Sequence, residues 1–424
     1  MAFKKLNTYS QRWEYIQPYM HNGEAWEEVF HSESNSWYRS SLFIKDEYIG
    51  KGTILQRDIR SMPLDPKSDE YAVYMSASTP FTPGGGWGAI TSLNTSSQGT
   101  QPIHAYLVDS LHPDANFKTW NGISIGQQSY VKTFQDTYMK GLVPQASWMT
   151  PAANGDRGIA IYDVGTGIMR EMFGAWEGQY KGGGGASVNT PGLKNLAVDN
   201  YSLQQTTGIS NVAGMHNSLG FIGISEVIMG EINHALCFTA GALRMLNDDG
   251  TERVSWPARA SDGKLEVFMP EHPLYRGRGN WQGGRYTPTH GQWGRVRADY
   301  NPEVNHKTGK KNGKLLQMVI RAAQKYGIVA TDTNLWCHAF NAEQGVSWKH
   351  AYGVDPWSAN GTLGQLLKDP DTGIPDFSVN DFPWDKTEWA PIDWGRPSPD
   401  YTYRPNQFNP WFRKHDQNGN NISR

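Results

Sequence analysis

Four residues of this chain have side chains suited to acid–base chemistry. His234 stands in the middle of residues 230–239, which read Gly-Glu-Ile-Asn-His-Ala-Leu-Cys-Phe-Thr, and Glu226 and Glu231 precede it closely. Asp156 lies further upstream. A histidine and carboxylates can transfer protons, and two carboxyl groups about 5–10 Å apart can hydrolyse a glycosidic bond. These four residues are the candidates for catalysis on a carbohydrate.

The same residues also have structural interpretations. Ile232 and Leu236 flank His234 at the two-residue period of a strand, which places the imidazole on an apolar face. A hydrogen-bonded core histidine is then the default, and a histidine that lines a cleft or binds a metal is the alternative. Glu226 and Glu231 can equally be solvated surface carboxylates.

The sequence predicts no metal or cofactor. It has no Cys-x-x-Cys and no His-x-x-x-His spacing, and its two cysteines, Cys237 and Cys337, are expected to be buried free thiols rather than a disulfide. The glycine runs at 84–86 and 182–185 are not followed by Gly-Lys-Ser/Thr, so neither is expected to bind phosphate.

Composition favours an all-β protein. Charged residues make up only 19% of the 424 residues, whereas Gly (46), Tyr (20) and Trp (17) are abundant, as in proteins with many turns and strands. The net charge of −2 does not predict a general affinity for nucleic acid. No run of roughly 18 apolar residues predicts a membrane span. The N-terminus lacks an apolar segment, so we expect no ordinary signal peptide.

The chain divides into three expected parts. In residues 1–48, Trp13, Trp26 and Trp37 mark a short repeat of strand-like segments, with an Asn22-Gly23 turn between two of them. This repeat is similar to small β repeats near the ends of phage tail and tail-fibre proteins. Residues 49–370 form the main body, and residues 371–424 form an extension rich in Pro and aromatic residues that we expect to pack on the body or on a partner.

Strand-like alternation recurs through the main body, and Gly- and Pro-rich stretches separate the segments. Many short strands with turns between them favour a sandwich or a jelly roll. The segments with this alternation are 70–75, 103–108, 158–163, 264–268 and 294–299.

Two helices are expected. Residues 314–326 place apolar side chains on one face at helical spacing, and Gly327 follows as a residue that can adopt the left-handed conformation. A shorter helix is expected at 225–230, with Ser225 as its N-cap. The apolar positions of the first helix are Leu315, Leu316, Val319, Ile320 and Ala323.

Several motifs in order resemble one family. They are Ile-Asn-His-Ala-Leu at 232–236, Trp-Pro-Ala-Arg at 256–259 and Lys-Tyr-Gly-Ile-Val-Ala-Thr-Asp at 325–332. The chain resembles a group of poorly characterised β-sandwich proteins found among secreted bacterial proteins and in phage genomes, and the resemblance covers roughly residues 145–365. It implies the fold but no activity. Where the family carries a His, an Asp and an Arg, this chain has Gly158, Asn217 and Cys237, which favours binding over catalysis.

The expected fold is all-β: a jelly-roll-like β-sandwich with one packed amphipathic helix, a small N-terminal β appendage and an aromatic-rich C-terminal extension. The expected function is that of a phage virion protein of the tail or tail-fibre class that contributes to host adsorption by binding a cell-surface glycan. The tryptophans beside Gly-rich loops are expected to stack on sugars, and these are Trp87, Trp176, Trp281 and Trp293.

Two alternatives stay open, a carbohydrate-active enzyme (a polysaccharide hydrolase or lyase) and a purely structural virion component. Two kinds of partner are expected. One is a cell-surface polysaccharide, and the other is a set of virion proteins that would bind residues 1–48 of this chain. By analogy with tail fibres, which are usually trimers, a homo-oligomer is expected. Such a protein would assemble in the host cytoplasm and reach the outside on virions released by lysis.

Overall fold

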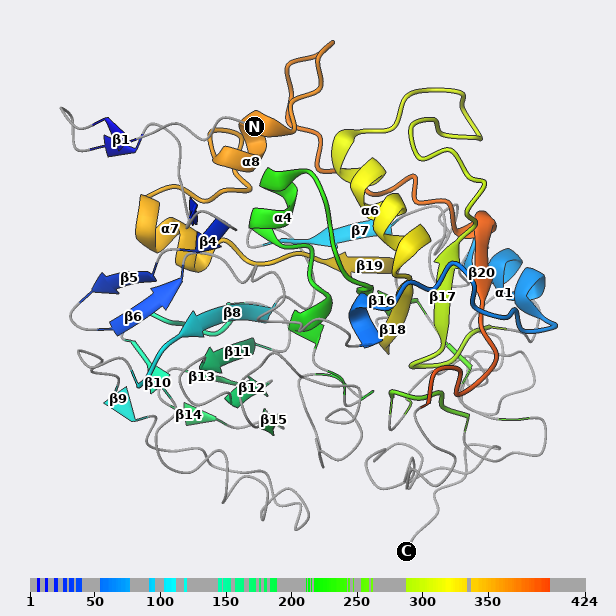
Figure 1. Cartoon of the computed structure of the whole chain (residues 1–424), viewed down its shortest axis with the longest axis horizontal. Coiled ribbons are helices and arrows are strands. Elements are labelled where there is room, and N and C mark those ends of the chain that lie inside the picture. Colours follow the sequence, from blue (N-terminus) through cyan, green and yellow to red (C-terminus); the bar gives the residue numbers. More distant parts are fainter. Residues whose placement is uncertain are drawn as a thin grey trace, which may run out of the picture.

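The computed structural model describes part of the chain, and its secondary structure forms two six-stranded mixed sheets and several helices (Figure 1). The described residues are 6–7, 12–13, 19–21, 26–28, 30–33, 36–39, 54–76, 91–95, 103–111, 118–119, 144–146, 148–153, 157–163, 168–172, 175–176, 179–180, 184–188, 211, 213, 215, 217–241, 243–244, 247, 253–258, 261, 287–333 and 337–396.

The first sheet, sheet I, begins near the N-terminus and contains the strands expected at 103–108 and 158–163. Its central strands β8 and β11 run parallel, with Ala105 opposite Ala160, and its other pairs are antiparallel. The strands in spatial order are β15 (Gly184–Val188), β12 (Ile168–Met172), β11 (Gly158–Asp163), β8 (Ile103–Val108), β6 (Ser36–Arg39) and β5 (Phe30–Glu33).

The second sheet, sheet II, contains the end of the Ile-Asn-His-Ala-Leu motif and part of the C-terminal extension. Its order is β20 (Thr387–Trp389), β17 (Trp293–Val296), β18 (Ile328–Thr333), β16 (Leu236–Ala240), β19 (His338–Asn341) and β7 (Thr91–Asn94). The pairs β16–β18 and β19–β7 are parallel.

The described residues of the segment 1–48 form three successive antiparallel hairpins. They are β1 (Leu6–Asn7) with β2 (Arg12–Trp13), β3 (Tyr19–His21) with β4 (Trp26–Glu28), and β5 with β6. Trp13, Trp26 and Trp37 each lie in the second strand of a hairpin. The third hairpin also pairs with β8, so this segment continues into sheet I. Two further short pairs are β9 (Lys118–Thr119) with β10 (Pro144–Gln145) and β13 (Ala175–Trp176) with β14 (Gln179–Tyr180).

The predicted amphipathic helix is confirmed as α6 (Lys314–Lys325), and Gly327 follows it with a left-handed φ of +91°. The short helix is α4 (Ile224–Met229), and its N-cap is Gly223 rather than Ser225, which is buried inside the helix. Of the described residues, three more segments are α-helical: α1 (Ser68–Met75), α7 (Val346–Tyr352) and α8 (Thr362–Leu366).

The strand predicted at 70–75 is wrong, because these residues form α1. Tyr71, Ala72, Tyr74 and Met75 are buried while Val73 is 68% exposed, and this spacing fits one face of a helix. The strand predicted at 294–299 is β17 and ends at Val296. The strand predicted at 264–268 lies outside the described residues.

Two apolar cores lie on opposite faces of sheet II. One contains Phe238, Ile328 and Ala330 from the sheet together with the buried faces of α1, α4, α6, α7 and α8. The other contains Val329 from sheet II together with Ala105, Leu107 and Tyr162 from sheet I. The two sheets therefore share a core, and the helices cover the remaining face of sheet II (Figure 1).

The strands of a jelly roll pair antiparallel, whereas three pairs of the described strands are parallel. The all-β sandwich therefore stays a prediction. The core shared by the two sheets supports it, whereas the parallel strand pairs and the additional helices argue against it.

Candidate functional site

Two of the predicted acid–base residues, Glu226 and His234, form a pair in the core. The His234 Nε2 atom lies 3.0 Å from Glu226 Oε2, and the side chains are only 4% and 2% exposed. Glu226 lies in the first turn of α4, and His234 precedes β16. The other ring nitrogen, Nδ1, lies 2.8 Å from the carbonyl oxygen of Ala235.

The surroundings of this pair favour the charged form of the His234 imidazole. The Glu226 carboxylate also accepts hydrogen bonds from the backbone N–H groups of Gly223 and Asn233. Burial lowers the pKa of the His234 imidazole, but the charge of Glu226, the hydrogen bond to it and the nearby carbonyl groups outweigh burial, so the pKa is raised. The result is a buried ion pair that joins the start of α4 to the segment leading into β16.

This pair has a structural role in the fold. Its polar atoms are directed at each other and at backbone groups, so none is presented to a substrate. Glu231 lies on the surface and is not part of the pair, and Asp156 lies outside the described residues. Among the catalytic candidates that the structure describes, only Glu226 and His234 are brought together.

A second buried carboxylate, Glu171 on β12, has no local pattern in the sequence that predicts its role. It accepts hydrogen bonds from the N–H groups of Asn217 and Ser218 and from the Ser218 hydroxyl, and so holds the start of a 3₁₀ helix, η3 (Asn217–Gly220). Burial and the charge of Glu171 raise the pKa of the Cys237 thiol, which keeps this cysteine protonated and poorly nucleophilic. Cys237 and Cys337 are both free thiols, the first buried and the second half-buried.

The tryptophans expected to stack on sugars are described only in part. Trp293 lies on β17, is only 2% exposed and packs edge-on against Trp394 at a centroid distance of 6.3 Å. We therefore correct its assignment, because a fully packed ring has no face for a sugar. Trp176 lies on β13, but its side chain is outside the described residues, as are Trp87 and Trp281.

A polar surface loop before α6, residues 301–312, was not singled out from the sequence. We call it the lysine loop because it carries Lys307, Lys310 and Lys311. Its backbone is tightly bonded: the Asn305 side chain accepts from the N–H groups of Lys307 and Thr308, and the Asn305 N–H donates to the Lys310 carbonyl. Gly309 has a φ of +70°, which glycine adopts without strain.

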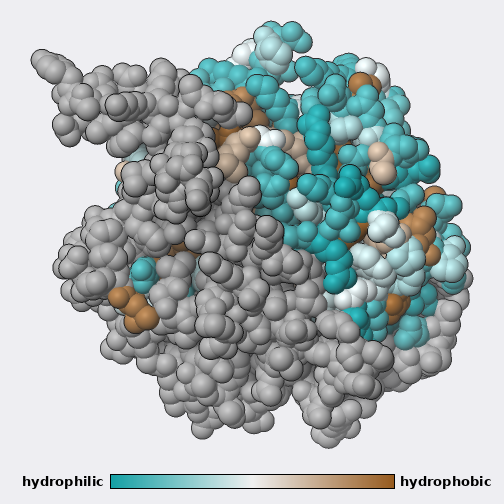
Figure 2. All heavy atoms as spheres, viewed as in Figure 1, coloured by the Kyte–Doolittle hydropathy of each residue, from teal (hydrophilic) through white to brown (hydrophobic). Residues whose placement is uncertain are grey.

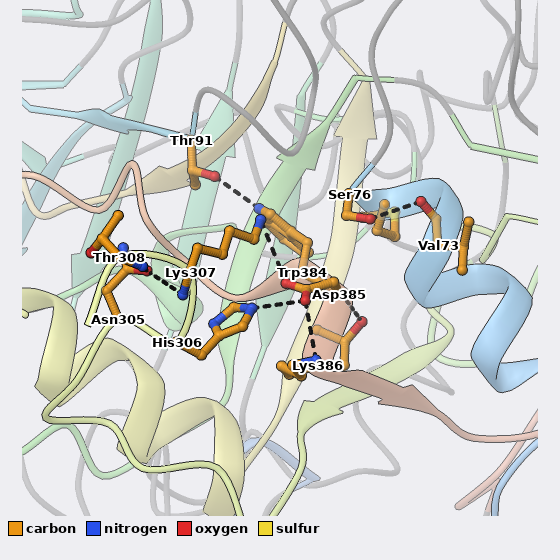
Figure 3. Close-up of polar contacts among 12 residues, drawn as sticks. Val73, Ser76, Thr91, Asn305, His306, Lys307, Thr308, Trp384, Asp385 and Lys386 are labelled. Carbon is orange, nitrogen blue, oxygen red and sulfur yellow. Dashed lines mark hydrogen bonds and ion pairs between the residues drawn. The ribbon is translucent and has the colours of Figure 1, made fainter. Parts of the chain in front are cut away.

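The side chains of this loop meet Asp385 in the 3₁₀ helix η4 (Trp384–Lys386). Figure 3 shows His306, Lys307 and Lys386 directed at the Asp385 carboxylate, at distances of 2.8, 3.6 and 3.3 Å. The Tyr300 hydroxyl lies 3.3 Å from the other ring nitrogen of His306. These contacts anchor the loop to the segment that leads into β20.

The charges around Asp385 are dominated by cations. Burial raises the pKa of this carboxyl, but the hydrogen bonds from His306 and Lys386 and the charges of Lys307 and His306 outweigh burial and hold the pKa below its usual value. The Asp385 carboxylate is therefore ionised at neutral pH. It neutralises only part of the positive charge that surrounds it, so the surface can attract anions.

A local charge count could have found this surface. Residues 305–314 contain four lysines and one histidine, whereas the net charge of the whole chain is −2 and conceals them. Figure 2 shows mostly hydrophilic side chains on the side of the molecule that carries α6 and the loop before it. Among the described residues, no group of three or more His, Cys, Asp or Glu side chains could hold a metal ion. No described helix has the length and apolarity needed to cross a bilayer.

Comparison with known proteins gives no further identification. No family model, no curated protein and no solved structure matches the chain. The resemblance stated from the motifs therefore stays a prediction.

Proposed function

We propose that this chain is a phage virion protein of the tail or tail-fibre class, and that it contributes to host adsorption by binding a cell-surface glycan. In this proposal the N-terminal hairpins attach the chain to other virion proteins, and the body carries the glycan-binding surface.

The observation that best supports the proposal is the repeated architecture of residues 1–48. Three hairpins follow one another, and each has a tryptophan in its second strand, at Trp13, Trp26 and Trp37. The recurrence of one tryptophan in each hairpin supports the interpretation of this segment as a repeat. A repeat of short hairpins has little core of its own, so docking on other proteins would stabilise it.

The site geometry favours binding over catalysis. The acid–base pair Glu226–His234 is enclosed and satisfied by the backbone, whereas the lysine loop presents charge on an ordered surface. Ordered loops on a rigid scaffold often carry binding functions.

The proposal is tested with the purified full-length chain and a panel of bacterial surface polysaccharides. We expect saturable binding to at least one polysaccharide, and immunogold labelling of phage particles at the tail. Labelling of the capsid, together with no binding to any glycan, would support the structural alternative instead.

The same incubations test the enzymatic alternative. New reducing ends or unsaturated uronates would contradict a function limited to binding. Glu231→Gln is the informative variant there, because Glu231 is exposed, whereas replacing His234 would perturb the core.

A further inference from the structure

We propose that the lysine loop is the glycan-binding surface and that its ligand is an acidic polysaccharide, one with carboxylate or sulfate groups. This inference rests on the proposed glycan-binding function and specifies its ligand. Lys307, Lys310 and Lys311 would contact the anionic groups, and Lys314 and Lys386 would add to the local potential.

The loop is held in place before any ligand arrives. The Asn312 N–H donates to the Glu303 carbonyl at 2.8 Å, and the Gln317 side chain on α6 donates to the Asn312 carbonyl at 2.8 Å. At the other end, the Gln324 side chain donates to the carbonyl of Tyr300 at 2.8 Å. A surface fixed in this way loses little backbone freedom on binding, which lowers the entropic cost of association.

The cations of the loop are available to a ligand. Lys310 and Lys311 are exposed and have no ion pair with any residue that the structure describes. Lys307 is 55% exposed and only loosely paired, at 3.6 Å from Asp385. Nearby carboxylates offset part of this charge: Asp385 faces Lys307 and Lys386, Glu303 faces Arg321, and Asp376 lies beside Gly313, the N-cap of α6.

The size and chemistry of the surface favour an acidic polysaccharide over nucleic acid. Duplex DNA carries one charge per about 1.7 Å of its axis and is usually bound by long basic tracks. The basic residues of the loop are three lysines and His306, and lysines act as point charges that can pair with carboxylate or sulfate groups without a fixed geometry. The loop has few cations and the whole chain has a net charge of −2, which favours a polymer that is less densely charged than duplex DNA.

The experiment measures binding of the full-length chain to dextran sulfate, to neutral dextran with the same backbone, and to duplex DNA. The variants are Lys310→Gln and the double variant Lys310→Gln/Lys311→Gln. The matched control is Lys349→Gln, an exposed lysine on α7, which lies well away from α6 (Figure 1).

We expect binding to dextran sulfate, no binding to dextran, and affinity for dextran sulfate that falls by about fivefold for Lys310→Gln and by about tenfold or more for the double variant. The dependence of the affinity on salt should become shallower as lysines are removed, because fewer counterions are released. Lys349→Gln should bind as the unmodified chain does.

Three outcomes would overturn the inference. If the loop variants bind dextran sulfate as the unmodified chain does, the surface is wrong, and binding to other polysaccharides then decides whether the glycan-binding function stands. If no polysaccharide of any charge binds, both proposals fail. If DNA binds more tightly than dextran sulfate and depends on the same lysines, the partner is a nucleic acid.

Discussion

His234 shows how one residue type can have two opposite roles. Its imidazole could act as an acid or a base, but in the structure both ring nitrogens face acceptors, Glu226 Oε2 and the Ala235 carbonyl. Such a histidine is held in its charged form and orders the chain around it. A buried ion pair gives little net stability on its own, but loss of one partner leaves an uncompensated charge, which is costly.

We therefore predict that His234→Gln lowers the free energy of unfolding by about 3 kcal/mol or more near pH 6. Because the folded-state pKa of His234 is raised, the stabilisation by the pair is fully present below the unfolded-state pKa of about 6.5 and is lost as pH rises through the folded-state pKa. Urea unfolding at several pH values should show the difference between the two proteins shrinking in alkali. A difference that does not change with pH would contradict the ion pair.

His338 is predicted to have the opposite dependence on pH. Its Nδ1 atom accepts a hydrogen bond from the Gly241 N–H, and its Nε2 atom lies 3.0 Å from the Met75 carbonyl oxygen. Burial lowers its pKa to about 3 despite that carbonyl. The unfolded chain takes up a proton near pH 6.5 and the folded chain does not, so stability should fall by up to about 1.4 kcal/mol per pH unit in this range as acid is added.

The measurement is the free energy of unfolding between about pH 4 and pH 7 for the unmodified chain and for His338→Gln. The variant should be less stable at pH 7 but should lose less stability in acid. Equal slopes would show that His338 does not remain neutral in the folded state.

At the residue scale, the sequence identified His234 and Glu226 as chemically capable but could not assign their role. Whether a side chain faces a core or a groove depends on contacts with distant segments. Glu171 illustrates this, because its partner Ser218 is 47 residues away. The prediction that Trp293 binds a sugar was wrong because its ring packs against Trp394, which comes from a distant part of the chain.

At the scale of elements, local patterns predicted α6 and the strands β8 and β11 well. The apolar positions of α6 repeat over three turns and a glycine follows, so local signals agree with the tertiary environment. In residues 68–75, the local pattern and the tertiary environment point to different elements. Tyr71, Val73 and Met75 alternate as in a strand, but the helix buries Tyr74 and leaves Val73 exposed.

Gly327 and Gly353 provide a matched test of how helices end in this fold. Both follow helices with left-handed φ values, +91° and +79°. A Cβ at Gly353 would have open space, whereas one at Gly327 would lie 2.7 Å from the Gly294 carbonyl oxygen and also close to Ile59. We predict that Gly353→Ala lowers the free energy of unfolding by about 1 kcal/mol. Gly327→Ala should lower it by at least about 2 kcal/mol, because overpacking adds to the strain.

Thermal and urea unfolding of the two variants check this prediction. The difference between them reports the contacts of the α6 terminus with β17 and Ile59, since the cost of the left-handed conformation is common to both. Equal destabilisation would mean that this terminus is not packed against Gly294 and Ile59.

At the scale of the whole molecule, sequence patterns did not give the pairing of strands. β7 pairs with β19 although more than 240 residues separate Asn94 from Asn341. Local patterns predict which residues of a strand are buried, but they do not predict which other strand pairs with that strand. Parallel pairs need long connections, and the sequence gives no local sign of where such connections begin and end.

The C-terminal extension shows the same limit. The sequence marks residues 371–424 as a separate segment, but Phe382, Trp384 and Trp389 lie in the core that α6 covers, and β20 is a strand of sheet II. Aromatic residues in a Pro-rich segment were a sign of packing, and the structure identifies what they pack on. Trp384 joins four parts of the chain, because its ring contacts Phe238, His338 and Phe340 and its Nε1–H donates to the Thr91 hydroxyl at 2.8 Å.

We predict that Trp384→Ala lowers the free energy of unfolding by about 3–5 kcal/mol, because a large ring is lost from a site with no exposure. Thr91→Val should cost about 1–3 kcal/mol, since it keeps the shape of the side chain but leaves the indole N–H without its acceptor. The double variant should lose less than the sum of the two, because the hydrogen bond can be lost only once. Urea unfolding measures all three variants.

Two results would contradict this account. If Trp384→Ala were as stable as the unmodified chain, the segment after residue 371 would be peripheral to the fold. If the effects of the two single variants were strictly additive in the double variant, the hydrogen bond between Trp384 and Thr91 would contribute nothing to stability.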